Sequence, residues 1–144
     1  PAAVRTKVRE VRREASEGAR LESARTVVAG GGGMQGVQGF ELAGRLADAL
    51  GGAVGASRVA CDLGWCPPSR QVGLSGKTVA PELYIAIGIS GAGQHMAGCA
   101  NAKNIVAINN DPKAPIFRFA RYGVVGDCHQ VMPALIDKIE ALRK

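Results

Sequence analysis

The sequence predicts an α/β fold in which one parallel sheet is flanked by helices within a single domain. Short hydrophobic runs alternate with helical patterns along the 144 residues, which is typical of a doubly wound parallel sheet. The chain is 47% hydrophobic, enough to build a core, and its 20 glycines stand mainly at the joints between these runs. These observations favour a folded, loop-rich domain over a disordered chain.

The strands are expected at five hydrophobic runs, residues 24–29, 53–56, 83–89, 104–108 and 122–126. Between the first two runs, an amphipathic helix is expected to pack on the sheet through Leu42, Ala43, Leu46, Ala47 and Leu50. A shorter helix should begin within residues 90–95. The last helix is expected over residues 129–142, where apolar residues recur at helical spacing and Pro133 is placed in the first turn.

The third predicted strand ends in a turn of small and polar residues, Ser90-Gly91-Ala92-Gly93-Gln94-His95. A buried parallel strand followed by such a turn leaves free backbone N–H groups and the positive end of a helix at one point. This arrangement suits a phosphate group, so the stretch predicts a nucleotide site.

A glycine run after the first strand gives a weaker signal. Gly31, Gly33 and Gly36 satisfy G-x-G-x-x-G, which in dinucleotide folds allows a tight turn beside a pyrophosphate. The same fingerprint requires an acidic residue at the end of the second strand to hold the ribose. Here that strand ends in Ser57-Arg58, and Asp62 lies beyond it, so conventional NAD binding is disfavoured.

Residues 57–79 show little regular periodicity, and a loop of this length in a compact domain is usually functional or mobile. It carries Arg58, Arg70, Gln71, Ser75 and Lys77, each of which taken alone is more often a surface residue than a ligand contact. Ligands of doubly wound sheets bind beyond the carboxyl ends of the strands. The residues expected at those ends, which could converge, are Ser57, Ser90, Asn109 and Asp127.

The composition excludes several classes of function. The net charge is +6, but aromatic residues are only 4% and are not interleaved with basic clusters, which disfavours nucleic-acid binding. No apolar run is long enough to cross a membrane, and the cysteine spacing indicates reduced thiols, as in a cytosol or a mitochondrial matrix. The chain begins at Pro1, which suggests a piece of a longer protein.

The residues offer no evident acid–base machinery. Only two histidines are present, neither at a recognisable nucleophile–base spacing, and no metal site is expected from Cys61 and Cys66. Cys128 at a helix start could have a lowered thiol pKa, although packing is the commoner role. Such an inventory suits a cofactor that does its own chemistry, and Arg58 could stabilise the anionic reduced form of a flavin. The alternative is a module for ADP, AMP or NAD with a structural or regulatory role.

Five motifs in one order carry a resemblance to a known family: GASR from Gly55, QVGLSGK from Gln71, VAPELYIAIGISGAGQHMAG from Val79, IVAINNDPKAPIF from Ile105 and YGVVGD from Tyr122. Together they resemble the C-terminal, FAD-binding domain of the electron transfer flavoprotein alpha subunit. The resemblance implies a Rossmann-like (DHS-like NAD/FAD-binding) domain at residues 24–144, holding an extended FAD. Residues 1–23 would be a linker containing a lead-in strand at residues 4–11.

The resemblance also implies roles for particular residues. Arg58 would lie over the flavin ring, Ser75 near flavin N5 and His95 near the pyrimidine end. The remaining members of the implied FAD site are Gln71, Val72 and Gly73 along the ring and ribityl chain, Ser57, Ser90, Gly91 and Gln94 at the ribityl or phosphate groups, and Asn109 and Asp127 on the adenosine side.

Members of this family carry electrons singly from flavin dehydrogenases to a quinone oxidoreductase or another acceptor, as a heterodimer with a beta subunit. The resemblance therefore implies these partners, and a bacterial cytoplasm or a mitochondrial matrix as the location. One departure concerns the glycine loop, which usually reads GGRG in the family. Gly32 stands at the position of that arginine, so a phosphate contact would be weakened or supplied by another residue.

Overall fold

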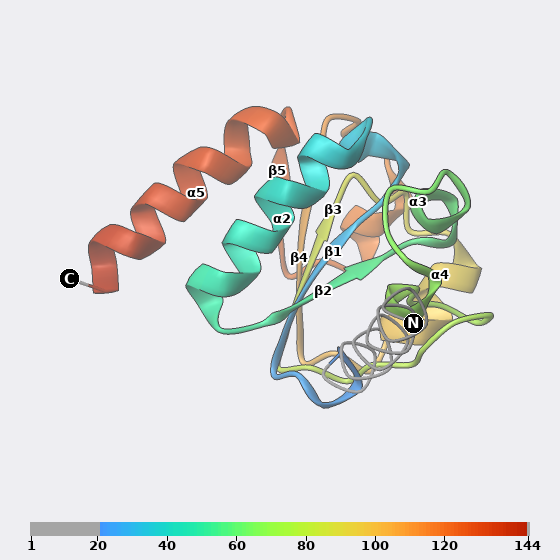
Figure 1. The fold of residues 1–144 in the computed structure, drawn as a ribbon. Helices are drawn as coiled ribbons and strands as arrows, with labels where there is room; N and C mark the ends of the chain where they lie inside the picture. Colours follow the sequence, from blue (N-terminus) through green and yellow to red (C-terminus); the bar gives the residue numbers. More distant parts are fainter. Residues whose placement is uncertain (1–20, 144) are drawn as a thin grey trace, which may run out of the picture.

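The computed structural model describes residues 21–143 and contains, in that range, a five-stranded parallel sheet (Figure 1). The strands stand in the order β2-β1-β3-β4-β5. Their bounds are Thr26–Gly30 for β1, Ala53–Ala56 for β2, Leu83–Ile87 for β3, Asn104–Asn109 for β4 and Tyr122–Val125 for β5. Every neighbouring pair is parallel, which confirms the predicted fold class.

Helices cover both faces of the sheet. The α-helices are α2 (Val37–Leu50), α3 (Arg58–Asp62), α4 (Gly93–Cys99) and α5 (Cys128–Arg143), and the 3-10 turns are η1 (Gly32–Met34), η2 (Pro68–Arg70) and η3 (Pro115–Arg118). The long helices α2 and α5 lie side by side over one face, and α4 lies on the other (Figure 1).

Alternation along the strands divides the core into two layers. In β3, Ile85 and Ile87 pack with α2 and α5, whereas Tyr84 and Ala86 pack with α4. All four are almost fully buried, as a parallel sheet covered on both faces requires. Leu21 also packs into the second layer, and residues 21–23 are helical.

The strand order places a switch point between β1 and β3. The chain leaves β1 for β2 on one side, and the next strand, β3, returns to the other side of β1. Loops that leave two such strands diverge, which opens a crevice beyond their carboxyl ends. Positions in the loops after β1, β2 and β3 therefore decide what the molecule can bind.

Several element boundaries differ from the sequence-based expectations. The strand predicted to reach residue 89 ends at Ile87, because Gly88 adopts a left-handed φ of 64°. The segment 57–79, expected to be irregular, contains α3 and η2, and Pro133 lies inside α5 rather than in its first turn. The lead-in strand expected at residues 4–11 lies outside the described residues.

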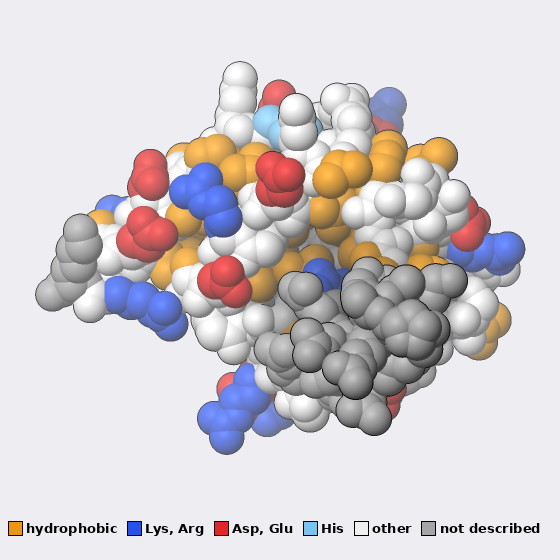
Figure 2. All heavy atoms as spheres, viewed as in Figure 1, with side chains coloured by type: hydrophobic (Ala, Val, Ile, Leu, Met, Phe, Trp, Pro, Cys, Tyr) orange, Lys and Arg blue, Asp and Glu red, His pale blue; other side chains and the backbone are white. Residues whose placement is uncertain are grey.

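The edge strand β5 is more exposed to solvent than the other strands of the sheet. All four residues of β5, at the edge of the sheet, are exposed, including Tyr122, Val124 and Val125. On the face seen in Figure 2, acidic and basic side chains are interspersed. Among residues 21–143, no helix combines the length and apolar character that a membrane crossing requires.

Candidate functional site

A central cavity of about 320 Å³ opens at the switch point of the sheet. Its lining comes from the loops after three strands: Gly32 and Gly33 after β1, Ser57, Arg58 and Val59 after β2, and Gly88, Ile89, Ser90, Ala92, Gln94 and His95 after β3. The fold thus brings together residues that lie more than 60 positions apart in the sequence, at the edge where ligands of such sheets bind.

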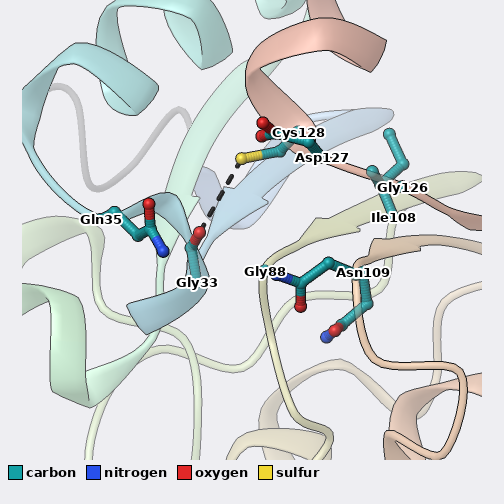
Figure 3. Close-up of a pocket in the computed structure, with 9 residues that line it drawn as sticks. Gly33, Gln35, Gly88, Ile108, Asn109, Gly126, Asp127 and Cys128 are labelled. Carbon is teal, nitrogen blue, oxygen red and sulfur yellow. Dashed lines mark hydrogen bonds between the residues drawn. The ribbon is translucent and has the colours of Figure 1, made fainter.

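Two smaller cavities adjoin the central one. The loop cavity, about 30 Å³, shares three of its lining residues and adds the segment from Gln71 to Ser75; its lining is Arg58, Gln71, Val72, Gly73, Leu74, Ser75, Gln94 and His95. The helix cavity, about 130 Å³, shares Gly33 and Gly88 and reaches the start of α5 (Figure 3); the rest of its lining is Gln35, Ile108, Asn109, Asn110, Gly126, Asp127 and Cys128. Together the three form an extended crevice.

The loop from Gln71 to Ser75 is fastened to α4 by backbone contacts. The N–H of Leu74 donates to the Gln94 carbonyl at 2.7 Å, and Gly73, at a φ of 145°, lets the two chains approach. Gly98 of α4 has no room for a Cβ because the Gly73 backbone fills that space. Two walls of the crevice are therefore one packed unit.

Within this loop, the Gln71 amide Nε2 donates to the Ser75 hydroxyl oxygen at 3.0 Å. Because the hydroxyl oxygen accepts this bond, its own hydrogen remains available for a ligand acceptor. The Val72 side chain, in contrast, is buried in the core, so only its backbone could meet a ligand.

His95 is buried at the junction of the loop and central cavities. Its Nε2 lies 2.8 Å from the Tyr84 hydroxyl, whereas Nδ1 has no hydrogen-bond partner among the described residues. Burial lowers the pKa of His95 to about 4, and the nearby Val72 backbone offsets only part of that shift. The ring is therefore neutral near pH 7 and offers the crevice a polar but uncharged group.

The start of α3 places Ser57 and Arg58 on the central cavity. Ser57 caps the helix, since its hydroxyl accepts from the Ala60 N–H at 3.3 Å. Arg58 follows, with an exposed side chain whose Nε lies 3.6 Å from an Asp62 carboxylate oxygen. Arg58 thus provides a positive charge at the mouth shared by two cavities.

In the helix cavity, the predicted polar residues already make hydrogen bonds within the protein. The Asn109 side chain donates to the Ile89 carbonyl at 3.0 Å and accepts from the Asp111 N–H at 2.9 Å. One Asp127 carboxylate oxygen caps α5 by accepting from the His129 N–H at 2.9 Å. Both residues hold the crevice in shape, and the second Asp127 oxygen remains for a ligand.

The glycine run after β1 packs closely against the backbone at the end of β3. The Gly31 N–H donates to the Ile87 carbonyl and the Gly33 N–H to the Gly88 carbonyl, both at 3.0 Å. A Cβ on Gly31 would lie 2.6 Å from the Gly88 oxygen, so a side chain does not fit there. These two amides are used inside the protein, which explains why the glycine fingerprint is a weak predictor here.

The structure therefore brings the predicted site residues into one crevice, except Gly91. Gly91, at a φ of 91°, packs against the Ile116 backbone and lines none of the three cavities. Sequence reasoning missed other lining residues, mainly Val59, Gly88, Ile89, Ala92 and Gln35. Gly88, directly after β3, was the signal that could have predicted them, because a glycine there indicates a turn at which two loops approach closely.

The cysteines of the described residues are free thiols. Burial and the Asp127 charge raise the pKa of Cys128, and backbone hydrogen bonds oppose this only partly. The lowered pKa considered for this thiol from its place at a helix start is therefore wrong. The pKa of Cys61 is lowered instead, because Cys66 donates a hydrogen bond to it.

The crevice fits an extended, phosphate-containing ligand. Its central part is mainly apolar, polar side chains line both ends, and His95 lies where the loop and central cavities meet. No side chain caps the start of α4, whose N-cap is Ala92. Because α4 has only seven residues, its dipole is a small contribution, and the shape of the crevice is the stronger observation.

Comparison with known proteins gives a consistent result. The family profile described as the electron transfer flavoprotein FAD-binding domain matches residues 20–100. The electron transfer flavoprotein subunit alpha of Thermoanaerobacterium thermosaccharolyticum is 53% identical over 140 residues, 97% of this chain and 42% of that protein. The Bacillus subtilis subunit alpha is 50% identical over 139 residues, 96% of this chain and 43% of that protein.

A mitochondrial subunit alpha from Dictyostelium discoideum is 56% identical over 125 residues, 87% of this chain and 35% of that protein. The chain thus spans less than half the length of these curated relatives.

Proposed function

The chain belongs to the electron transfer flavoprotein alpha subunit family, through the FAD-binding domain, and from that premise we propose that it binds FAD along the crevice and carries electrons. FAD supplies the redox chemistry when bound. The residues of this chain bind it, orient it and set the charge around it.

One observation carries the proposal: the three adjoining cavities contain the residues that the family resemblance assigns to FAD, Gly91 excepted. They also follow the assigned order, with flavin-side residues in the loop cavity, ribityl and phosphate residues in the central cavity and adenosine-side residues in the helix cavity. A dinucleotide is long and narrow, and a chain of cavities suits it better than one deep pocket.

At the flavin end, three groups of different chemistry would act on the ring. Arg58 would place a positive charge near it, favouring an anionic reduced form. Ser75, held by Gln71, would donate a hydrogen bond. His95 would act as a neutral hydrogen-bonding group, since its low pKa keeps it uncharged near pH 7.

In the middle and at the far end, the groups would act mainly by positioning. Ser57, Ser90 and Gln94 would bond to the ribityl chain or phosphates, with Gly91 keeping the Ser90 turn tight. Asn109 and Asp127 would position the adenosine, Asn109 chiefly by fixing its own loop.

We further propose that the chain works within a larger assembly. The relatives are named as alpha subunits, which supports a heterodimer with a beta subunit, flavin dehydrogenases as donors and a quinone oxidoreductase or another acceptor. The loop cavity, at about 30 Å³, is too shallow to enclose a flavin ring, so a second protein surface would cover it. Residues 24–144 would form the FAD domain and residues 1–23 its lead-in, in a bacterial cytoplasm or a mitochondrial matrix.

The test is reconstitution of the purified chain with FAD, followed by visible spectroscopy and calorimetry. We expect a flavin spectrum perturbed from that of free FAD, one FAD per chain, and electron uptake from a flavin dehydrogenase once the beta subunit is added. A chain that binds no FAD, either alone or after the beta subunit is added, would refute the proposal.

A second candidate is a nucleotide module without a redox role. It is favoured by Gly32 at the position of the family arginine and by the Gly31 and Gly33 amides, which bond within the protein. Calorimetry with ADP, AMP and FAD separates the two candidates. Equal affinity for ADP and FAD would support the module, whereas a clear preference for FAD would support the carrier.

A further inference from the structure

Three side chains with metal-binding atoms meet at the start of α5. Ligand atoms of Asp127, Cys128 and His129 lie within 4.8 Å of one another, although the residues are consecutive in the sequence. Known zinc motifs place several residues between their ligands, so this spacing does not predict a metal site. The cluster lies at the helix cavity, where the Cys128 sulfur and the Asp127 carboxylate are on the same side (Figure 3).

The structure fixes which nitrogen of His129 is available. His129 Nε2 lies 2.9 Å from the Met34 carbonyl oxygen, and a carbonyl can only accept, so Nε2 carries the hydrogen. In the neutral ring, Nδ1 then bears the free lone pair. Metal-binding histidines are typically held in this way, with the other ring N–H donated to a carbonyl or carboxylate.

The other two groups also have ligand capacity left. Asp127 uses Oδ1 to accept from the His129 N–H, which leaves its second oxygen. The Cys128 thiol donates one weak hydrogen bond, 3.8 Å to the Gly33 carbonyl. That contact is lost at little cost when the thiol gives up its proton to bind a metal.

We propose that Asp127, Cys128 and His129 form a binding site for Zn²⁺. Mixed nitrogen, sulfur and oxygen donors suit zinc, and three protein ligands leave a fourth position for water or a ligand atom in the helix cavity. The positive end of α5 opposes a cation, but the thiolate and the carboxylate supply two negative charges that offset it. Binding releases the Cys128 proton.

This site does not depend on the proposed flavin function. It shares Asp127 with the proposed adenosine contacts, so zinc and FAD would compete for that carboxylate if both bind. All zinc measurements are therefore made on the chain freed of nucleotide, and a failure to bind FAD would leave the zinc result unchanged.

The test is titration with zinc chloride by calorimetry, and with Co²⁺ as a spectroscopic substitute. We expect one zinc per chain and a near-ultraviolet band from thiolate-to-cobalt charge transfer. Cys128→Ser should remove that band, and Cys128→Ser and His129→Gln should each weaken zinc binding at least about tenfold. The matched control is the double variant Cys61→Ser and Cys66→Ser, which removes a pair of thiols that contact each other. It should change neither the zinc affinity nor the cobalt band.

A measurement on the unaltered chain guards against variants that fail to fold. Zinc should shift the nuclear magnetic resonance signals of the His129 ring, and should leave those of the His95 ring, which lies against Tyr84, unchanged. The proposal is overturned if zinc does not bind stoichiometrically, if zinc leaves the His129 ring signals unchanged, or if the cobalt band survives Cys128→Ser but disappears in the Cys61 and Cys66 variant.

Discussion

His95 couples the stability of the fold to pH, because it is neutral when folded. Its pKa is lowered to about 4 from 6.5, so the unfolded chain binds a proton more readily between these values. The free energy of unfolding should therefore be fully retained above pH 6.5 and fall as the pH drops, by about 3 kcal/mol at pH 4. Urea unfolding from pH 4 to 7.5 measures it.

The control is His95→Gln, which can still accept a hydrogen bond from Tyr84 but does not titrate. Tyr84 and Cys99, the titratable groups around this ring, stay protonated in this range because burial raises the pKa of both. The variant should show a flatter dependence on pH. If the free energy of unfolding depends on pH equally in both proteins, His95 is not the cause of the pH dependence.

Arg58 is the residue through which charge at the crevice should act on a bound flavin. Arg58→Ala should lower the flavin reduction potential, because a positive charge stabilises the anionic reduced form. The side chain is largely exposed, 64%, so solvent screening limits the effect to about 1 kcal/mol, or roughly 40 mV for one electron. Spectroelectrochemistry of the FAD-loaded protein gives the value.

Two variants make that measurement specific. Arg58→Lys keeps the charge and should keep most of the potential, whereas Arg45→Ala removes the same charge from the exposed face of α2, away from the cavities. If Arg45→Ala and Arg58→Ala lower the flavin reduction potential equally, the change comes from net charge and not from the position of Arg58.

At the scale of elements, the glycine loop and α2 contain glycines with opposite roles. A Cβ on Gly31 would lie 2.6 Å from the Gly88 oxygen and 3.1 Å from the Ile89 Cα, whereas one on Gly44 would meet nothing within 4 Å. Gly31→Ala should therefore cost about 1–3 kcal/mol of unfolding free energy, and Gly44→Ala should add roughly 0.5–1 kcal/mol. Urea denaturation of the two variants measures these free energies. If Gly31→Ala and Gly44→Ala change the free energy of unfolding in the same direction, the assigned roles are wrong.

Gly32, between the packed glycines, has room for a side chain. It is exposed, and its Cβ would meet only a Val59 methyl carbon, at 3.4 Å. Gly32→Arg should therefore fold and tighten FAD binding up to about fivefold through a new phosphate contact, with the gain fading as salt is added. Calorimetry at two salt concentrations tests this, and Gly32→Ala, expected to be neutral, is the control. If Gly32→Arg and Gly32→Ala change the FAD affinity equally, the arginine charge is not the cause of the change.

The sequence predicts elements well where one signal dominates. The five strands are hydrophobic runs bounded by small residues, and each is found within two residues of its expected bounds. Helix α3 was missed because five residues are too few to show helical periodicity, although Ser57 as N-cap was a usable signal. Strand β3 was extended too far because hydrophobicity continues to Ile89, whereas the backbone turns at Gly88.

At the scale of the whole molecule, strand order is what the sequence could not supply. Periodicity predicts a parallel sheet and that ligands meet its carboxyl edge, but not that β1 and β3 are neighbours. That pairing sets Gly33 against Gly88 and joins the central cavity to the helix cavity. The motif resemblance predicted polar residues that line the crevice, whereas backbone packing decides which glycine and apolar residues line it.

The order of the cavities across the molecule predicts which end of the dinucleotide each one contacts. Ser75 lies in the loop cavity, at the opposite end from Asp127, and its hydroxyl hydrogen is available because its oxygen accepts from Gln71. Ser75→Ala should weaken FAD binding about two- to tenfold, the value of one hydrogen bond, and leave ADP binding unchanged, because ADP has no flavin. Thr78→Ala, exposed and outside the three cavities, controls for the same chemical change nearby. Calorimetric affinities for both ligands decide the orientation: a loss of ADP affinity equal to that of FAD would place the adenosine, not the flavin, beside Ser75.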